Sequence, residues 1–80
     1  MGMGKQTKRE VQNVDGVVVE RVRTVSKRGV PNGYFFEKRD GQYSREGYFI
    51  EGKLEGAVNY MIDQDRIAHT AYYKGGVRVD

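Results

Sequence analysis

Few residues in this chain combine the types and the spacing that catalysis requires. His69 is the only histidine and there is no cysteine, so no disulfide or thiolate metal site can form. The hydroxyl groups of Ser26, Ser44 and Thr70 have no nucleophile motif around them. A lone histidine in a strand is more often structural than a general base. We therefore expect no enzyme and no catalytic residue.

The acidic and glycine-containing segments do not form an ion or nucleotide motif. Asp63 and Asp65 lie in a polar segment that lacks the glycine and the distal glutamate of an EF-hand loop, so a hairpin turn is the better interpretation. The glycines have the spacing of hairpins, and no helix follows them as it would in a phosphate-binding loop. The sequence predicts neither a metal nor a cofactor.

Aromatic residues are the strongest candidates for a binding function. The chain has six tyrosines and three phenylalanines. Tyrosine suits interfaces because its ring is apolar while its hydroxyl forms hydrogen bonds. The alternative is that most of these rings pack in the core or lie on the surface without a partner. The candidate partner-binding residues are Tyr34, Phe36, Tyr43, Tyr48, Phe49, Tyr60, Tyr72 and Tyr73.

Basic residues are concentrated in the N-terminal part of the chain. Residues 1–30 contain seven Lys/Arg and three Asp/Glu, a net charge of +4, whereas the whole chain carries +3. Such a segment attracts an acidic protein, a nucleic acid or an anionic surface, or is simply a solvated face with a flexible arm. The predicted basic flank consists of Arg21, Arg23, Lys27 and Arg28.

Two binding functions agree with these residues. The first is a non-enzymatic protein-binding or scaffold module, for example an inhibitor, that docks on another protein or on a second copy of itself. The alternative is a single-stranded nucleic-acid-binding module that uses the strand aromatics and the basic flank. Glu37, Glu46 and Glu51 interleave the aromatic strands, and a groove that follows phosphates would avoid them. Protein binding is therefore favoured.

Turn signals and β-type runs predict the elements that position these residues. Asp15-Gly16 and Asp40-Gly41 are strong signals for two-residue hairpin turns, and residues 63–66 form a longer polar turn. Helix periodicity is nearly absent. We expect an all-β fold with little or no helix, an antiparallel meander of about three consecutive hairpins. The predicted arms are residues 10–14 and 17–25, residues 34–39 and 42–50, and residues 57–62 and 67–74.

The predicted domain organisation is a disordered basic arm over residues 1–9 and a single hairpin domain over residues 10–80. No apolar run approaches the roughly 20 residues of a membrane span. The N-terminus also lacks the apolar segment of a secretion signal. A cytoplasmic protein without a transmembrane segment is the expectation.

Regular alternation along the strands predicts aromatics on both faces of the sheet. In the second hairpin it assigns Tyr34, Phe36, Tyr43 and Phe49 to one face, and Phe35, Tyr48 and Ile50 to the other. In the third it assigns Val58, Tyr60, Ile62, Ile67 and Tyr73 to one face, and Met61 and Tyr72 to the other. A sheet that is apolar on both sides is expected to curl on itself or to pack against a second copy, so a homodimer is expected.

Repetition is the strongest organisational signal in the chain. The glycine pair Gly29 and Gly33 returns as Gly52 and Gly56, and the segment 46–52 returns as 70–76. A regular period of about 20–50 residues indicates one small unit stacked on copies of itself. Each unit is expected to be a hairpin.

These segments resemble the MORN repeat and its bacterial variant. The resemblance covers residues 28–78 and is best over 46–56, where an aromatic pair precedes a Gly-Lys-x-x-Gly loop. Residues 17–25 lack the aromatics and Gly75-Gly76 replaces the loop, as capping units would. The resemblance implies an elongated, twisted sheet of successive hairpins. It also implies the functions of that family: protein-binding scaffolds, contacts with phospholipid head groups, and antitoxin-like proteins in bacteria.

Overall fold

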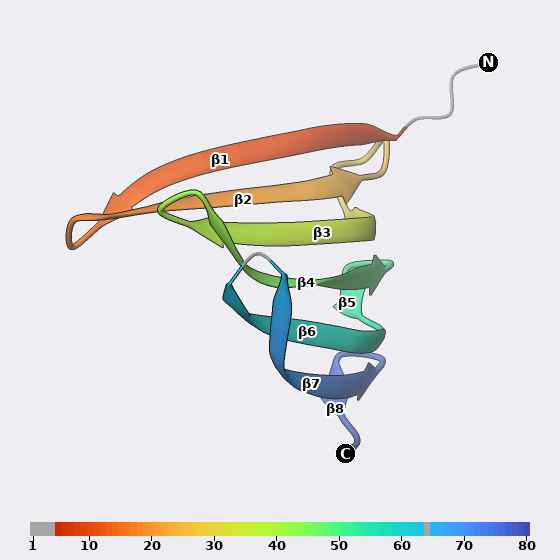
Figure 1. The fold of residues 1–80 in the computed structure, drawn as a ribbon. Helices are drawn as coiled ribbons and strands as arrows, with labels where there is room; N and C mark the ends of the chain where they lie inside the picture. The colour runs from red at the N-terminus through yellow and green to blue at the C-terminus, as the bar shows by residue number, and fades with distance from the viewer. Residues whose placement is uncertain (1–4, 64) are drawn as a thin grey trace.

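The computed structural model of the chain describes residues 5–63 and 65–80, which form a single antiparallel sheet without a helix (Figure 1). The sheet has the order β1-β2-β3-β4-β6-β7-β8, and the short strand β5 also pairs with β4. The strands are β1 (Gln6–Val14), β2 (Val17–Val25), β3 (Pro31–Arg39), β4 (Gln42–Ile50), β5 (Lys53–Leu54), β6 (Gly56–Asp63), β7 (Arg66–Lys74) and β8 (Val77–Arg78). The predicted all-β meander of three hairpins is confirmed in β1–β2, β3–β4 and β6–β7.

Two hairpin tips adopt the backbone that their sequences predict. Asp15 and Gly16 have φ angles of 52° and 84°, and Asp40 and Gly41 have φ angles of 49° and 83°. Positive φ at both central residues defines the type I′ turn, whose twist matches that of the flanking strands. At the third tip Asp63 pairs with Arg66, and residue 64 of the predicted turn lies outside the described residues. No helix long and apolar enough to cross a membrane occurs in residues 5–63 and 65–80.

The hairpin repeat appears in the backbone hydrogen bonds. The amide of Glu55 donates to the carbonyl of Tyr48 at 3.0 Å, and one repeat later the amide of Val79 donates to the carbonyl of Tyr72 at 2.8 Å. The strand β5 pairs with the end of β4 in the same way as β8 pairs with the end of β7. Consecutive units therefore share one local backbone arrangement.

The first strand begins earlier than the sequence analysis predicted. The strand β1 starts at Gln6 and pairs with β2 along its whole length, from Gln6 opposite Val25 to Val14 opposite Val17. The disordered arm predicted over residues 1–9 is therefore wrong for residues 6–9, and residues 1–4 lie outside the described part. The backbone ladder with β2 orders this polar segment although all nine of its residues are exposed.

A β-bulge changes which aromatics share a face in the second hairpin. Between β3 and β4 the register places Glu37 opposite Arg45 but Lys38 opposite Tyr43, so Ser44 is the extra residue. One extra residue moves every side chain beyond it to the opposite face. Tyr48 therefore lies beside Tyr34, and Phe49 lies on the other face, which reverses the assignment made from regular alternation.

Register shifts in the third hairpin move one further residue. Tyr60 pairs with His69, but the next pair is Met61 with Ile67, so Ala68 is an extra residue in β7. Directly opposed residues project to the same face. Ile67 therefore shares its face with Met61, and the predicted grouping of Ile67 with Val58 is wrong.

The core lies on one side of the sheet, which we call the core face; the opposite side is the outer face. The twist visible in Figure 1 curves the sheet around its core face, and the principal extents of the chain are 38 × 31 × 21 Å. The buried hydrophobic residues are Val19, Val25, Phe35, Val58 and Ala71.

Gly47 allows the largest of these residues to pack across the sheet. A Cβ atom on Gly47 would lie 3.0 Å from Cε1 of Phe35 and 3.0 Å from Cγ2 of Val58. The Phe35 ring therefore lies over the glycine and reaches Phe49, with 4.8 Å between ring centroids. A side chain at position 47 would separate these core residues.

Candidate binding surfaces on the two faces of the sheet

The outer face carries a continuous row of aromatic rings on β3 and β4. The ring centroids of Tyr48 and Tyr34 are 5.5 Å apart, those of Tyr34 and Phe36 are 6.1 Å apart, and those of Phe36 and Tyr43 are 5.2 Å apart. Tilted and edge-on pairs at these distances are favourable aromatic arrangements. We call these four residues the aromatic row. All four were predicted from the sequence as partner-binding residues.

The aromatic row ends in a cation. The Nζ atom of Lys38 lies 4.8 Å from the ring centroid of Tyr43 and 5.7 Å from that of Phe36. At the other end the rings are open to solvent, since 55% of Tyr48 and 39% of Tyr34 are exposed. The row thus presents apolar rings, hydroxyl groups and one positive charge to an approaching molecule.

Hydrogen bonds hold the row in place across four strands. The hydroxyl of Tyr34 donates to Glu46 at 2.7 Å, the amide of Asn59 donates to the same carboxylate at 3.1 Å, and the hydroxyl of Thr70 donates to Asn59 at 2.8 Å. Loss of water around the hydroxyl and the hydrogen bond to Glu46 raise the pKa of Tyr34. The phenol therefore remains a neutral donor, and the ring is oriented by β4 and β6.

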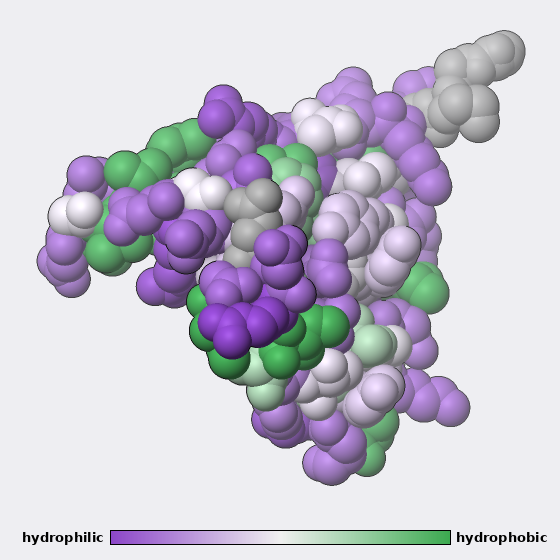
Figure 2. Space-filling view, viewed as in Figure 1, coloured by the Kyte–Doolittle hydropathy of each residue, from purple (hydrophilic) through white to green (hydrophobic). Residues whose placement is uncertain are grey.

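Apolar surface away from the row lies mainly near hairpin tips. Figure 2 shows it over the tip of the β1–β2 hairpin and beside the tip of the β6–β7 hairpin. The residues concerned include Val11 and Val18 on the first hairpin, and Ile62 and Ile67 on the third, each between 43% and 61% exposed. These aliphatic patches lack the ring contacts and hydrogen bonds that orient the aromatic row.

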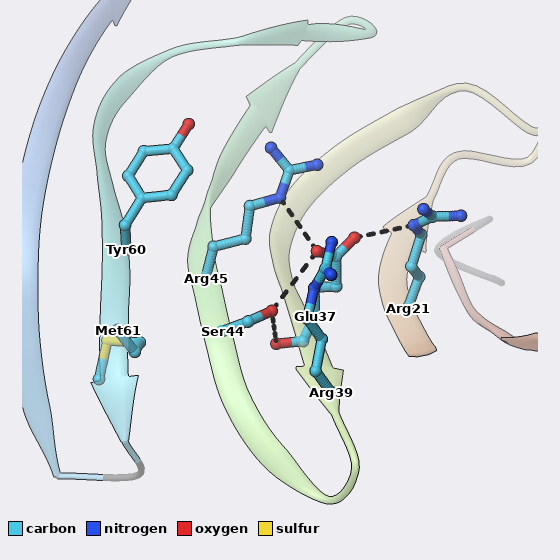
Figure 3. Close-up of a pocket in the computed structure, with 7 residues that line it drawn as sticks. All are labelled: Arg21, Glu37, Arg39, Ser44, Arg45, Tyr60 and Met61. Carbon is cyan, nitrogen blue, oxygen red and sulfur yellow. Dashed lines mark hydrogen bonds and ion pairs between the residues drawn. The ribbon is translucent and has the colours of Figure 1, made fainter. Parts of the chain in front are cut away.

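The core face carries an arginine-lined groove (Figure 3). Glu37 lies at its floor with only 8% of its side chain exposed, and its Oε2 accepts a hydrogen bond from Nε of Arg21 at 2.8 Å. On the other side, Nε of Arg45 lies 3.8 Å from Oε1 of Glu37. Glu37 thus positions two guanidinium groups from β2 and β4. The groove is lined by Arg21, Glu37, Arg39, Ser44, Arg45, Tyr60 and Met61.

The other predicted aromatics are divided between the faces. Tyr72 lies on the outer face, opposite Ala57, and is 51% exposed. Phe49, Tyr60 and Tyr73 lie on the core face, and a hydrogen bond with Tyr60 is the main cause that raises the pKa of Tyr73. The eight predicted residues therefore do not form one surface.

The predicted basic flank is also divided. Arg21 and Arg23 project to the core face, opposite Glu37 and Phe35, and Arg23 donates to Glu10 at 3.4 Å. Lys27 and Arg28 instead lie in the exposed turn between β2 and β3. Aromatic row and arginine groove consequently lie on opposite faces, although a single-strand groove requires rings and cations on one surface.

Sequence reasoning missed most of the arginine groove. Glu37 was taken as an acid that opposes anion binding, whereas the structure places it beneath the cations as their anchor. The spacing of Glu37 and Arg39, two residues apart on one strand, was a usable signal because such residues share a face. Arg45 joins them only because of the bulge at Ser44.

Metal chemistry has no support in the geometry of the described residues. In residues 5–63 and 65–80 no group of three or more His, Asp or Glu side chains is arranged to hold an ion. His69 lies beside Arg78, with 3.0 Å between Nε2 and Nη2, and its ring centroid is 6.0 Å from that of Tyr60. This neighbourhood gives the imidazole cationic and aromatic contacts.

Comparison of the chain with protein-family models, with curated proteins and with solved structures found no match. The resemblance to MORN repeats therefore stays a prediction.

Proposed function

We propose that this protein is a non-enzymatic binding module that docks on an acidic partner protein through the outer face of its sheet. The observation that carries the proposal is the aromatic row, in which Tyr34 and Tyr48 are exposed and Phe36 and Tyr43 are half-buried, although the chain has a separate core on the other face. Exposed, ordered aromatic clusters are typical of interface centres.

Charge supports an acidic partner. The chain carries a net charge of +3, and Lys38 lies at the end of the row over Tyr43 and Phe36. Glu46, the acid nearest the row, already accepts hydrogen bonds from Tyr34 and Asn59. A carboxylate of the partner would therefore meet Lys38, while apolar partner groups cover the rings.

The arrangement of the faces favours this function over binding of single-stranded nucleic acid. Base stacking on the aromatic row would leave the backbone phosphates on the outer face, where Lys38 lies over Tyr43 and Phe36 and Arg9 is already paired with Glu20. That ion pair is close enough to lower the pKa of Glu20. Three arginines, Arg21, Arg39 and Arg45, instead lie together on the core face.

Truncation of two exposed tyrosines tests the proposal. We expect Tyr48→Ala combined with Tyr72→Ala to weaken partner binding by about 30-fold or more, since even one tyrosine at the centre of an interface contributes about 2 kcal/mol. Val77→Ala with Val79→Ala is the matched control, because these residues are 65% and 61% exposed and lie outside the row. Circular dichroism checks that both variants stay folded.

The partner itself is found by affinity capture, and the measurement is the affinity of the purified partner for the three proteins. A captured protein that binds the tyrosine variant and the unmodified chain equally would refute the proposal. Light scattering on the unmodified chain measures its molar mass and so shows whether the partner is a second copy. The edge strand β1 of the chain, with nine exposed residues and only one neighbouring strand, is the place where two copies could join.

A further inference from the structure

The arginine groove holds more positive charge than its own acid neutralises. Arg21, Arg39 and Arg45 line it together with one carboxylate, that of Glu37. Among the described residues, no carboxylate lies within 4.0 Å of the guanidinium of Arg39. The groove therefore has a net charge of about +2 that the described residues do not compensate.

The guanidinium groups are held so that their terminal nitrogens stay available. A guanidinium has five N–H donors, and of those of Arg21 only Nε donates to Glu37. The Nε atom of Arg45 is buried, lies too far from Glu37 for a hydrogen bond, and has no other partner in the described residues. Its guanidinium carbon lies 5.5 Å from the ring centroid of Phe35, which fixes its position.

The hydroxyl of Ser44 completes the floor of the groove. It donates to the backbone carbonyl of Glu37 at 3.1 Å and lies 3.4 Å from Oε1 of the same residue. The carboxylate of Glu37 is thus held from two neighbouring strands, β2 and β4, and the two arginines that it positions approach from opposite sides (Figure 3). Such an anchored pair loses little conformational freedom when an anion binds.

We propose that this groove binds a phosphate group, supplied by inorganic phosphate or by a small soluble phosphate monoester. A phosphate monoester carries a charge of about −1.5 to −2 at neutral pH, which matches the excess charge. The terminal nitrogens of arginine bond two phosphate oxygens at once. The groove is open to solvent and has a volume of about 460 Å³, within the usual size of small-molecule sites. Tyr60, which lies on the core face with Glu37 and Arg45, forms the wall against which the organic part of an ester lies.

Calorimetric titration with inorganic phosphate and with phenyl phosphate tests the site. Arg39→Gln is the first variant, because Arg39 contacts no acid in the described residues and its loss removes no ion pair. We expect it to weaken phosphate binding about tenfold or more. Arg28→Gln changes the net charge equally at a residue 80% exposed in the turn after β2, so we expect no change in affinity.

A second variant separates specific hydrogen bonds from simple charge. Arg39→Lys keeps the charge but loses the planar two-pronged donor, so its affinity should fall between those of the unmodified chain and Arg39→Gln. Arg45→Gln should weaken binding as Arg39→Gln does, and thermal melting shows whether each variant is folded.

Tighter binding of phenyl phosphate than of inorganic phosphate identifies an ester as the ligand class; the reverse identifies free phosphate.

Several results would overturn the proposal. One is the absence of heat or of a chemical-shift change with either ligand, and another is equal weakening by Arg28→Gln and Arg39→Gln. A single-stranded oligonucleotide that binds with a salt dependence of several released ions would replace the single-phosphate site by a polymer groove. The paired tyrosine variant on the outer face must leave phosphate affinity unchanged, so failure of either proposal leaves the other intact.

Discussion

Replacement of Gly47 by alanine probes the packing on which the core face depends. The new Cβ atom would meet the Phe35 ring and the Val58 side chain, each at 3.0 Å. Both neighbours are almost fully buried, with 5% and 0% exposure, so neither can move aside without disturbing the core. The φ angle of Gly47 is not positive, so the backbone itself accepts alanine.

The expected effect is the balance of two contributions. Overpacking of a filled core costs about 1–3 kcal/mol, while replacement of glycine by alanine restricts the unfolded chain and stabilises by about 0.4–1 kcal/mol. We expect the free energy of unfolding to fall by about 1–2 kcal/mol. For a domain of this size that corresponds to a decrease in Tm of about 5–15 °C.

Urea denaturation of four proteins measures this contribution: the unmodified chain, Gly47→Ala, Phe35→Leu and the double variant. Because leucine leaves space beside position 47, the double variant should lose less stability than the sum of the two single changes. Without the bulge at Ser44, Gly47 would face outward and alanine would stabilise the strand. A stabilised Gly47→Ala, or strict additivity in the double variant, would therefore refute the described register.

Two further changes test local geometry. The pKa of Tyr34 is raised in the folded chain, so its neutral phenol contributes fully to the free energy of unfolding below about pH 10, and this contribution is lost as pH rises through the folded pKa. In urea denaturation, Tyr34→Phe should therefore remove this part of the loss of stability at alkaline pH. An unchanged loss would contradict the hydrogen bond from Tyr34 to Glu46 as its cause. Glu51 has a φ of 49° in a two-residue turn with Gly52, so Glu51→Asn should stabilise by about 0.5–1 kcal/mol because asparagine tolerates this conformation. Thermal melting of that variant with no increase in Tm would show that the turn is not strained.

The hairpins could be predicted from the sequence because their determinants are local. Asp15-Gly16 and Asp40-Gly41 specify turns with positive φ at both residues, and the structure has them at those positions. The interval between the two glycine pairs is one residue shorter than the interval between the two aromatic segments. This difference also has a local cause, because the two turns that contain glycine differ in length by one residue. Ser26 and Val30 bond across a turn of three residues, whereas Ile50 pairs with Lys53 across a turn of two.

The faces could not be predicted because they depend on a feature without a sequence signal. The extra residue in β4 is a serine within a run of ordinary strand residues, and nothing in its neighbourhood marks a bulge. Its hydroxyl bonds the Glu37 carbonyl across the strand pair, an interaction that exists only once β3 and β4 are paired. Regular alternation therefore failed at Tyr48 and Phe49, four and five residues beyond the bulge.

The same extra residue connects the two proposed sites. It turns Arg45 toward Glu37 on the core face, and it turns Tyr48 toward Tyr34 on the outer face. With regular alternation, Arg45 would point to the outer face, and the groove would keep only one guanidinium positioned by Glu37. Tyr48 would likewise point to the core face and would no longer be part of the aromatic row. Since a strand has only two faces, each residue beyond the bulge that joins one surface leaves the other. The geometry of the arginine groove and that of the aromatic row thus have a common origin, although their proposed ligands would bind independently on opposite faces.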